Sequence, residues 1–457
     1  MKIRIAAAIL TVRITTLFLR IFGSGGTSFP GKAAMFFQRN LLEKLAKNIT
    51  IVVITGTNGK TTSARITAEI LKVSGLSFFE NKSGANLISG ITASFAMNST
   101  LFGKPKNKYA VIECDEAAFK TVCPMLKPHT IVVTNLFRDQ LDRFGEITHT
   151  RNNIISGIQA SPTSVIVLNA DDSLAYSISD SIINKTILYG MDSPPYGNDG
   201  DFLSDAPYCI KCKSPYTYKY RTYGHLGDFS CKNCGYSRIN PLISADNIEL
   251  GSSSSKIKLN INGTEADAEI ALPGAYNIYN ALSSAAAALT LGIEAVDIIN
   301  AMSSFKSGFG RMESLNLGGT DVNMILVKNP AGLNQVINFL STDNTQKKLI
   351  MILNDNFADG TDISWIWDVN FEKFSTFQSS LAEITVTGIR AEELALRFKY
   401  AGIDTDCIAV EKDYSKVIDN VIVNNDGMPV YILPTYTAMF DFRKALSRRY
   451  KIRKFWK

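Results

Sequence analysis

A β-branched apolar run that ends in a glycine turn constrains the fold of this chain more than any other stretch. Residues 51–54 read Ile-Val-Val-Ile, and Thr55-Gly-Thr-Asn-Gly-Lys-Thr-Thr62 follows before a helix-compatible segment that reaches Leu71. This order predicts a buried strand, a tight loop and a helix start, an arrangement that binds phosphate groups. The common phosphate-loop pattern has a glycine where Ile54 stands, so a strand-turn-helix unit without a ligand is the alternative. Gly-Lys-Thr directly after a strand favours a nucleotide site.

The residue types of this loop suit a nucleotide and its metal ion. Gly56 and Gly59 let the backbone approach phosphates with no Cβ in the way. Lys60 can reach the β- and γ-phosphates, and the Thr61 hydroxyl can bind Mg²⁺. The expected nucleotide-binding residues are Gly56, Thr57, Asn58, Gly59, Lys60, Thr61 and Thr62.

Composition narrows the protein class. The chain has 457 residues, enough for two or three domains, and is 46% hydrophobic and 20% charged, as ordinary globular proteins are. The formal net charge of +6 comes without a long basic run with interleaved aromatics, so nucleic-acid binding has little support.

Other apolar runs also end in polar residues. We predict strands at residues 109–112, 130–135 and 165–168. Glu113 follows the first strand, the second ends in the polar residue Asn135, and Asn169-Ala-Asp-Asp172 follows the third. This pattern is typical of a parallel sheet that binds ligands beyond the carboxyl ends of its strands. Glu113 is therefore a candidate Mg²⁺ ligand, with a solvated loop carboxylate as the alternative.

The first 22 residues are apolar but interrupted by arginines. No uninterrupted stretch is long enough to cross a bilayer. On a helix, Lys2, Arg13 and Arg20 fall within about 20° of one another. Two interpretations stay open: a helix packed on its own domain, or an amphipathic helix on a membrane surface. We expect the glycine-rich segment from Gly23 to Gly31 to act as a linker.

Four of the seven cysteines form two C-x-x-C pairs, with eighteen residues between the pairs. This spacing predicts a closed, structural Zn²⁺ site made of Cys209, Cys212, Cys231 and Cys234. Residues 205–240 contain few aliphatic side chains, so we expect the metal to fold this segment. Cys114, Cys123 and Cys407 are expected to be ordinary buried thiols.

A separate α/β unit is predicted after residue 313. Its expected strands cover residues 322–327, 348–353, 383–387, 406–410 and 429–433. Polar loops follow several of these strands, and one of them carries Asp355, Asp359 and Asp362. Asp362 is the best candidate to cap a helix that begins near Ile363, which leaves Asp355 for another use.

These motifs, taken together, resemble the Mur ligase family. The resemblance rests on the phosphate loop, Glu113, Thr134-Asn135, Asp139-Gln-Leu-Asp-Arg-Phe-Gly145, Asn169-Ala-Asp-Asp172, Leu272-Pro-Gly-Ala-Tyr-Asn-Ile-Tyr-Asn-Ala281 and Gly310-Arg-Met-Glu313. It implies an ATP-dependent ligase in which Asn277 and Asn280 lie at the nucleotide and Arg311 lies near its phosphates. Gln140 replaces the usual histidine, and the family's carbamylated lysine has no evident counterpart, so a second metal site stays open.

The expected architecture is therefore α/β throughout. An N-terminal amphipathic helix and linker (1–47) precede a phosphate-loop-containing Mur ligase central domain (48–313) with a zinc-ribbon insertion (205–240). A Rossmann-like α/β C-terminal ligase domain (314–457) follows. In that domain the family's Asp-Tyr-Ala-His-Asn-Pro has become Ile325-Leu-Val-Lys-Asn-Pro330.

That altered motif, the loop from Asn354 to Asp368 and the cysteine insertion are similar to the MurT branch of the family. This resemblance implies amidation of the D-glutamate α-carboxylate of lipid II at the inner face of the plasma membrane, with ammonia from a GatD-like glutaminase subunit. It also implies that Asp355 orients a histidine in the partner's active site. Only 47 residues precede the central domain, which suits a lipid-linked substrate better than a soluble uridine nucleotide.

The cysteines agree that any glutaminase is a separate chain. Cys114, Cys123 and Cys407 lack the glycine flanks of a nucleophile on a sharp turn, and His129, His149 and His225 suggest no partner for one. Two alternatives remain: a folylpolyglutamate-synthase-like or other amino-acid-adding ligase, and a non-catalytic nucleotide-binding scaffold. Thr61-Thr62 and the cysteine insertion argue against the folylpolyglutamate-synthase-like ligase.

Overall fold

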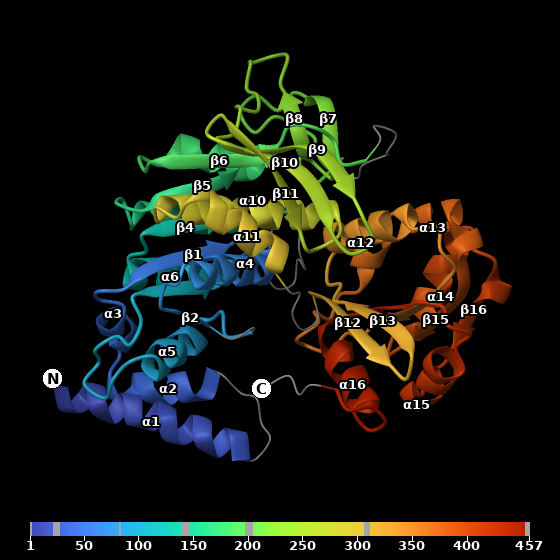
Figure 1. Cartoon of the computed structure of the whole chain (residues 1–457), viewed down its shortest axis with the longest axis horizontal. Helices are drawn as coiled ribbons and strands as arrows, with labels where there is room; N and C mark the ends of the chain where they lie inside the picture. Colours follow the sequence, from blue (N-terminus) through green and yellow to red (C-terminus); the bar gives the residue numbers. More distant parts are fainter. Residues whose placement is uncertain are drawn as a thin grey trace. The chain divides into compact units, whose positions relative to one another are not determined.

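The computed structural model describes residues 2–21, 28–81, 84–138, 147–196, 204–305 and 311–452, apart from the side chains of Lys2, Arg20 and Arg311. The chain divides into two compact units, which are described separately (Figure 1). The first comprises residues 1–137 and 146–305, and the second comprises residues 138–145 and 306–457.

The first unit is built on a nine-stranded sheet of order β11-β10-β9-β6-β5-β4-β1-β3-β2. The seven strands from β9 to β2 run parallel, while β10 and β11 extend the sheet as antiparallel strands. Its strands are β1 (Thr50–Thr55), β2 (Phe78–Glu80), β3 (Tyr109–Glu113), β4 (Thr130–Val133), β5 (Val165–Asn169), β6 (Thr186–Met191), β9 (Ile243–Leu250), β10 (Ser255–Ile261) and β11 (Thr264–Ile270). The predicted parallel sheet is confirmed.

Helices surround this sheet. They are α1 (Lys2–Ile21), α2 (Ser28–Phe37), α3 (Leu41–Leu45), α4 (Lys60–Val73), α5 (Ile88–Met97), α6 (Glu116–Leu126), α8 (Ile147–Gln159), α9 (Ser173–Tyr176), α10 (Ala275–Thr290) and α11 (Ala295–Ser304). Between β6 and β9 the chain forms a separate hairpin of β7 (Thr217–Tyr223) and β8 (Leu226–Ser230).

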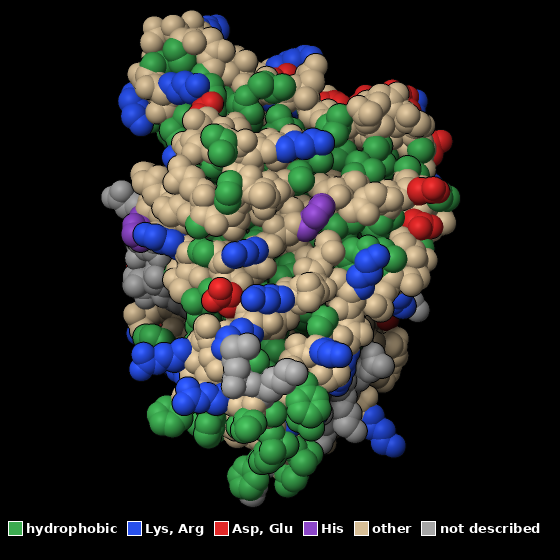
Figure 2. All heavy atoms as spheres, turned by 90° about the vertical axis from the view of Figure 1, so that its left-hand side faces the viewer, with side chains coloured by type: hydrophobic (Ala, Val, Ile, Leu, Met, Phe, Trp, Pro, Cys, Tyr) green, Lys and Arg blue, Asp and Glu red, His purple; other side chains and the backbone are tan. Residues whose placement is uncertain are grey.

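The N-terminal helix packs on its own unit by one face only. Ile5, Ile9 and Val12 on α1 are buried in the main core cluster, whereas the opposite face is exposed. Figure 2 shows hydrophobic side chains gathered at the lower end of the molecule, where α1 and α2 lie in Figure 1. No described helix is long and apolar enough to cross a membrane. The expected linker is wrong in part, because residues 28–31 form the first turn of α2.

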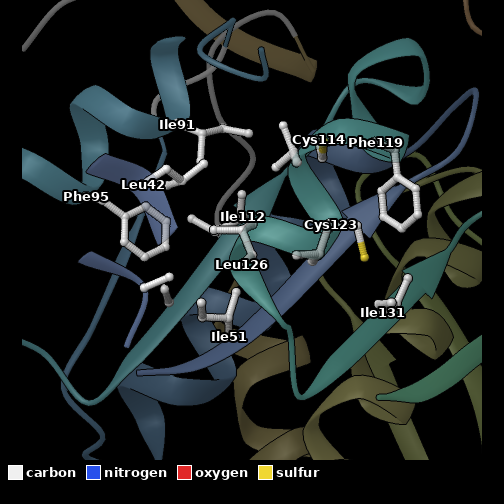
Figure 3. Close-up of a cluster of buried hydrophobic side chains, with 14 of the residues drawn as sticks. Leu42, Ile51, Ile91, Phe95, Ile112, Cys114, Phe119, Cys123, Leu126 and Ile131 are labelled. Carbon is white, nitrogen blue, oxygen red and sulfur yellow. The ribbon is translucent and has the colours of Figure 1, made fainter. Parts of the chain in front are cut away.

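The core beneath the parallel strands explains why the apolar runs form a sheet. Ile51, Ile112 and Ile131 lie on one face of neighbouring strands and pack with Phe119 and Leu126 of α6 (Figure 3). Cys114 and Cys123 lie in the same cluster and are buried as predicted. The prediction for Cys407 is wrong, because that residue is only half-buried.

The second unit has a six-stranded sheet of order β12-β13-β17-β14-β15-β16, in which only the β12–β13 pair is antiparallel. Its strands are β12 (Arg311–Leu317), β13 (Thr320–Ile325), β14 (Lys347–Ile352), β15 (Leu381–Thr387), β16 (Ile408–Val410) and β17 (Val430–Pro434). Its helices are α12 (Pro330–Thr342), α13 (Lys373–Thr376), α14 (Ala391–Tyr400), α15 (Tyr414–Val417) and α16 (Tyr436–Leu446). All five predicted strands are present, each within about two residues of its expected bounds.

Candidate nucleotide site and cysteine cluster

The loop between β1 and α4 has the backbone geometry that the glycines predict. Gly56 has φ of +119° and Gly59 has φ of +84°, a region that residues with a Cβ rarely adopt. A Cβ on Gly59 would also lie 2.1 Å from Oδ1 of Asn280, so no larger residue fits there. Gly59 directly precedes α4, whose N-terminus carries a partial positive charge suited to an anion.

Lys60 begins α4 and is almost completely buried. Its Nζ donates to the Thr57 carbonyl at 3.2 Å and to Oε1 of Glu116 at 2.8 Å. Burial by itself lowers the pKa of Lys60, but the charge of Glu116 and its hydrogen bond outweigh that effect, and the pKa is raised overall. Lys60 is therefore a fixed cation at the helix N-terminus.

Glu116 is a site residue that the sequence analysis missed. It is buried in the first turn of α6, where its carboxylate meets Lys60 although the two residues are 56 positions apart. A buried lysine requires a counter-charge, and that rule is the signal that could have prompted a search for one.

The candidate Mg²⁺ ligands lie beside each other. The Thr61 hydroxyl donates to Oε2 of Glu113 at 2.8 Å, and Glu113 ends β3 next to β1. Asn81 fixes the Glu113 backbone by accepting from its N–H and donating to its carbonyl, both at 2.8 Å. An adjacent hydroxyl and carboxylate are the hard oxygen donors that Mg²⁺ prefers, so these side chains fit that ion.

The rest of the loop is fastened to the end of β4. The Asn58 N–H donates to Oδ1 of Asn135 at 2.9 Å, and Thr134 donates through its hydroxyl to the Asn58 carbonyl at 2.7 Å. The Phe137 N–H donates to the Thr57 hydroxyl at 3.1 Å. These bonds fix the loop, so its glycines and Lys60 are preorganised.

Asn280 on α10 lies next to this loop and contacts Asn277 one turn earlier in the helix; the family resemblance places both at the nucleotide, which stays a prediction. Asn280 donates to Oδ1 of Asn277 at 3.1 Å, and its own Oδ1 lies 3.4 Å from the Ser63 hydroxyl on α4. The side chain of Arg311 and the whole segment with Gln140 lie outside the described residues.

The four predicted cysteine ligands come together. The sulfur atoms of Cys209, Cys212, Cys231 and Cys234 all lie within 4.8 Å of one another, and none is in a disulfide. The Cys209–Cys234 and Cys212–Cys231 sulfur separations are 3.5 and 3.4 Å, whereas two thiolates on tetrahedral zinc lie about 3.8 Å apart. Hydrogen bonds with Asn233 and Ser214 lower the pKa of Cys212, whereas the pKa of Cys234 in the same cluster is raised. The donor set fits Zn²⁺.

Asp171 and Asp172 follow β5, a strand-end position that suggests ligand binding, but both contact another segment of the chain. Asp171 accepts from Arg238 Nε at 2.6 Å and from the Tyr279 hydroxyl at 2.6 Å. Asp172 accepts from the Leu136 N–H at 2.7 Å and lies 3.1 Å from Nε2 of buried His225. Since Arg238 and His225 belong to the cysteine-bearing segment, these carboxylates fasten that segment to the sheet.

Asp355 lies in the loop after β14. Its carboxylate accepts from Arg390 Nε at 2.7 Å and from Nη2 at 2.6 Å, and its side chain is 17% exposed. Asp359 is buried and accepts from the Thr437 N–H at 2.7 Å. Asp362 accepts from the Ser364 N–H at 2.8 Å at the start of a short 3₁₀ helix, close to the capping role expected of it.

Comparison with protein families matches both units. The Mur ligase middle domain model matches residues 54–206, and the MurT ligase C-terminal model matches residues 326–439. The lipid II isoglutaminyl synthase (glutamine-hydrolyzing) subunit MurT of Streptococcus pneumoniae strain R6 is 36% identical over 99% of both chains. The protein of the same name from Staphylococcus aureus strain COL is 36% identical over 94% of this chain and 95% of its own.

Solved structures show the same fold. A pseudomurein peptide ligase type C from Methanothermus fervidus has a TM-score of 0.67 at 21% identity, covering 90% of this chain and 81% of its own. A MurF ligase from Thermotoga maritima, solved in complex with ADP, has a TM-score of 0.63 at 14% identity, with coverage of 91% and 85%.

Proposed function

We propose, since this chain belongs to the MurT family of lipid II isoglutaminyl synthase subunits, that it is the ATP-dependent ligase that amidates the lipid II stem peptide. The reaction converts the α-carboxylate of D-glutamate to the amide, giving D-isoglutamine. Glutamine is the nitrogen donor, in keeping with the words glutamine-hydrolyzing in the relatives' names.

The observation that carries this proposal is the pairing of Lys60 with Glu116 beside that of Thr61 with Glu113, at the N-terminus of α4. In the proposed reaction, Lys60 and the loop amides bind the γ-phosphoryl group of ATP as it moves to the substrate carboxylate. Mg²⁺, held by Thr61 and Glu113, would supply further positive charge there. Ammonia then attacks the acyl phosphate, the C–O bond to phosphate breaks, and inorganic phosphate leaves.

The nitrogen source is a second chain in this proposal, a GatD-like glutaminase that forms a heterodimer with this one. Burial raises the pKa of Cys123 to about 11 and that of Cys114 well above its usual value, so neither is a ready thiolate nucleophile. Among the described residues, no hydrogen bond joins a histidine ring to a cysteine sulfur. We place the reaction at the inner face of the plasma membrane, because its substrate is lipid-linked.

The test uses the purified full chain with lipid II, Mg-ATP and ammonium chloride, followed by mass spectrometry of the lipid. The expected product is about one dalton lighter per stem peptide, because NH₂ replaces OH, and one ADP forms per amide. A control without ATP should leave the mass unchanged.

Two outcomes would overturn the proposal. A gain in mass equal to an added amino-acid residue would identify an amino-acid-adding ligase. Nucleotide binding without any ATP- and ammonium-dependent change in lipid II would identify a scaffold.

A further inference from the structure

The helix α1 is apolar on two opposite faces. Its inner face is buried in the core of the first unit through Ile5, Ala8, Ile9 and Val12. Its outer face carries six exposed large hydrophobic residues. Because each residue turns an α-helix by about 100°, the positions of these six fall within one arc of about 100° around the helix axis. These are Ile3, Leu10, Ile14, Leu17, Phe18 and Ile21. A surface helix ordinarily carries polar and charged residues on the face opposite the core, so this second apolar face is unusual.

The neighbouring helix α2 extends this exposed surface. Pro30, Gly31 and Ala34 are buried, and Gly31 lies so close to α5 that a Cβ would meet the Ser89 carbonyl. Phe29 and Phe36 share the other side, and Phe36 is 88% exposed. Contiguous exposed apolar surface of this kind marks an interaction site, whereas scattered single residues do not.

The charged residues of the segment that forms this surface are all of one sign. From Met1 to Leu42 the chain has no acidic residue and six basic ones, Lys2, Arg4, Arg13, Arg20, Lys32 and Arg39. The formal net charge of the whole chain is +6, so the remainder of the chain is balanced. Arg13 donates to the Ser99 carbonyl at 2.5 Å, whereas Arg4, Lys32 and Arg39 are exposed. Figure 2 shows Lys and Arg side chains above the hydrophobic cluster.

We infer that the outer face of α1 and α2 binds the surface of an anionic lipid bilayer. Apolar side chains flanked by cations match the acyl chains and negative headgroups of such a surface, with the helices lying in its plane. A face of this composition without acidic residues is a poor match for an ordinary protein partner, whose surface carries both signs of charge. The inference rests on α1 and α2 alone and needs no catalytic activity.

Flotation of the full chain with lipid vesicles tests this inference. Vesicles of phosphatidylcholine with phosphatidylglycerol should carry the chain to the top of the gradient, pure phosphatidylcholine vesicles should carry much less, and added salt should weaken binding. Ile14→Gln with Leu17→Gln should reduce the bound fraction about tenfold, because both exposed side chains then lose their contact with the acyl region. Ile183→Gln, at a residue that is 90% exposed outside these helices, is the matched control and should bind like the unaltered chain.

Three results would overturn the inference. The first is failure of the unaltered chain to float with anionic vesicles. The second is equal flotation of the paired variant while its thermal stability is unchanged. The third is a change from dimer to monomer in the paired variant without vesicle binding by either form, which would make this face a contact between copies of the chain. Because no ATP or lipid II is used, failure here leaves the amidation proposal untouched.

Discussion

Two loops of this chain leave the carboxyl ends of buried parallel strands, and they carry opposite charge. The loop after β1 leads through Gly59 into Lys60 at the start of α4. The loop after β14 carries Asp355 and Asp359 and is tied to neighbouring elements by side-chain hydrogen bonds. The same position in two α/β sheets thus prepares two different kinds of site.

The difference lies in which groups are presented. After β1, a helix N-terminus and a buried lysine present positive charge, which suits a phosphate chain. After β14, Asp359 is buried against Thr437, while Asp355 stays partly exposed and is held by Arg390. A positioned carboxylate of this kind can orient a cationic group or an imidazole, and its environment favours Asp355 over Asp359 for that role.

The largest effect is expected at the first loop. Lys60→Ala should reduce amidation about a thousandfold or more with ammonium as well as with glutamine, because phosphoryl transfer precedes the use of either nitrogen source. The measurement is the rate of lipid II amidation with each donor. Lys72→Ala, at an exposed lysine on the same helix, is the matched control.

Loss of Lys60 also leaves Glu116 buried without its counter-charge, which costs about 3–5 kcal/mol of stability. Adding Glu116→Gln should recover thermal stability without recovering activity. If Lys60→Ala alone kept substantial ammonium-driven amidation, Lys60 would not be the phosphate-binding lysine and the contrast between the two loops would fail.

A substitution in the loop after β14 should affect amidation with only one of the two nitrogen donors. We propose that Asp355 orients the histidine of the glutaminase partner, so Asp355→Ala should lower glutamine-driven amidation about a hundredfold while ammonium-driven amidation stays near normal. Asp362→Ala, at a surface carboxylate of the same loop, should change neither rate. Loss of both activities would place Asp355 in the ligase site, and loss of neither would give it no role beyond its ion pair with Arg390.

The sequence predicted the strands of both loops because each is a short apolar run bounded by polar residues. The prediction for residues 51–54 became β1 (Thr50–Thr55), and the prediction for residues 348–353 became β14 (Lys347–Ile352). The cysteine cluster was also predictable, since spacing alone identifies a four-thiolate set. These features are local, so each can be predicted from a short segment of the sequence.

The remaining features depend on contacts between distant segments. Glu116 follows β3 much as Asp171 and Asp172 follow β5, yet only Glu116 reaches the phosphate loop. The carboxylates after β5 instead hold the cysteine-bearing segment. The sequence could not distinguish these cases, because a carboxylate at a strand end gives the same pattern whether it contacts a ligand or another segment of the chain. For a similar reason the sequence left open whether α1 packs on its own domain or rests on a membrane surface, since the sequence does not say which face the core covers.

In our interpretation a metal ion holds the cysteine-bearing segment in its fold, whereas hydrogen bonds to the end of β4 hold the phosphate loop. Cys231→Ser should therefore remove the one zinc expected per chain and lower the melting temperature by about 5 °C or more. Ammonium-driven amidation per folded chain should change less than about threefold. Cys407→Ser is the control, and elemental analysis that finds no zinc in the unaltered chain, purified without chelator, would contradict the prediction.

The smallest effect tests whether the phosphate loop depends on this segment at all. His225 lies in the β7–β8 turn, where it meets Asp172 and its ring centroid lies 4.6 Å from that of Phe137. Phe137 in turn donates its N–H to the Thr57 hydroxyl of the phosphate loop. His225→Ala should therefore raise the KM for ATP about three- to tenfold with little change in kcat, because the loop loses a packed neighbour but keeps Lys60.

Zinc content separates this effect from unfolding of the segment. His225→Ala should retain its zinc, since His225 is not among the cluster's four sulfur ligands. The conservative variant His225→Gln, which keeps a hydrogen-bond donor for Asp172, should recover part of the lost ATP affinity. An unchanged KM in both variants would make the two regions independent. A raised KM accompanied by zinc loss would assign the effect to unfolding of the cysteine-bearing segment. The contact between His225 and Phe137 would then have no separate effect on ATP binding.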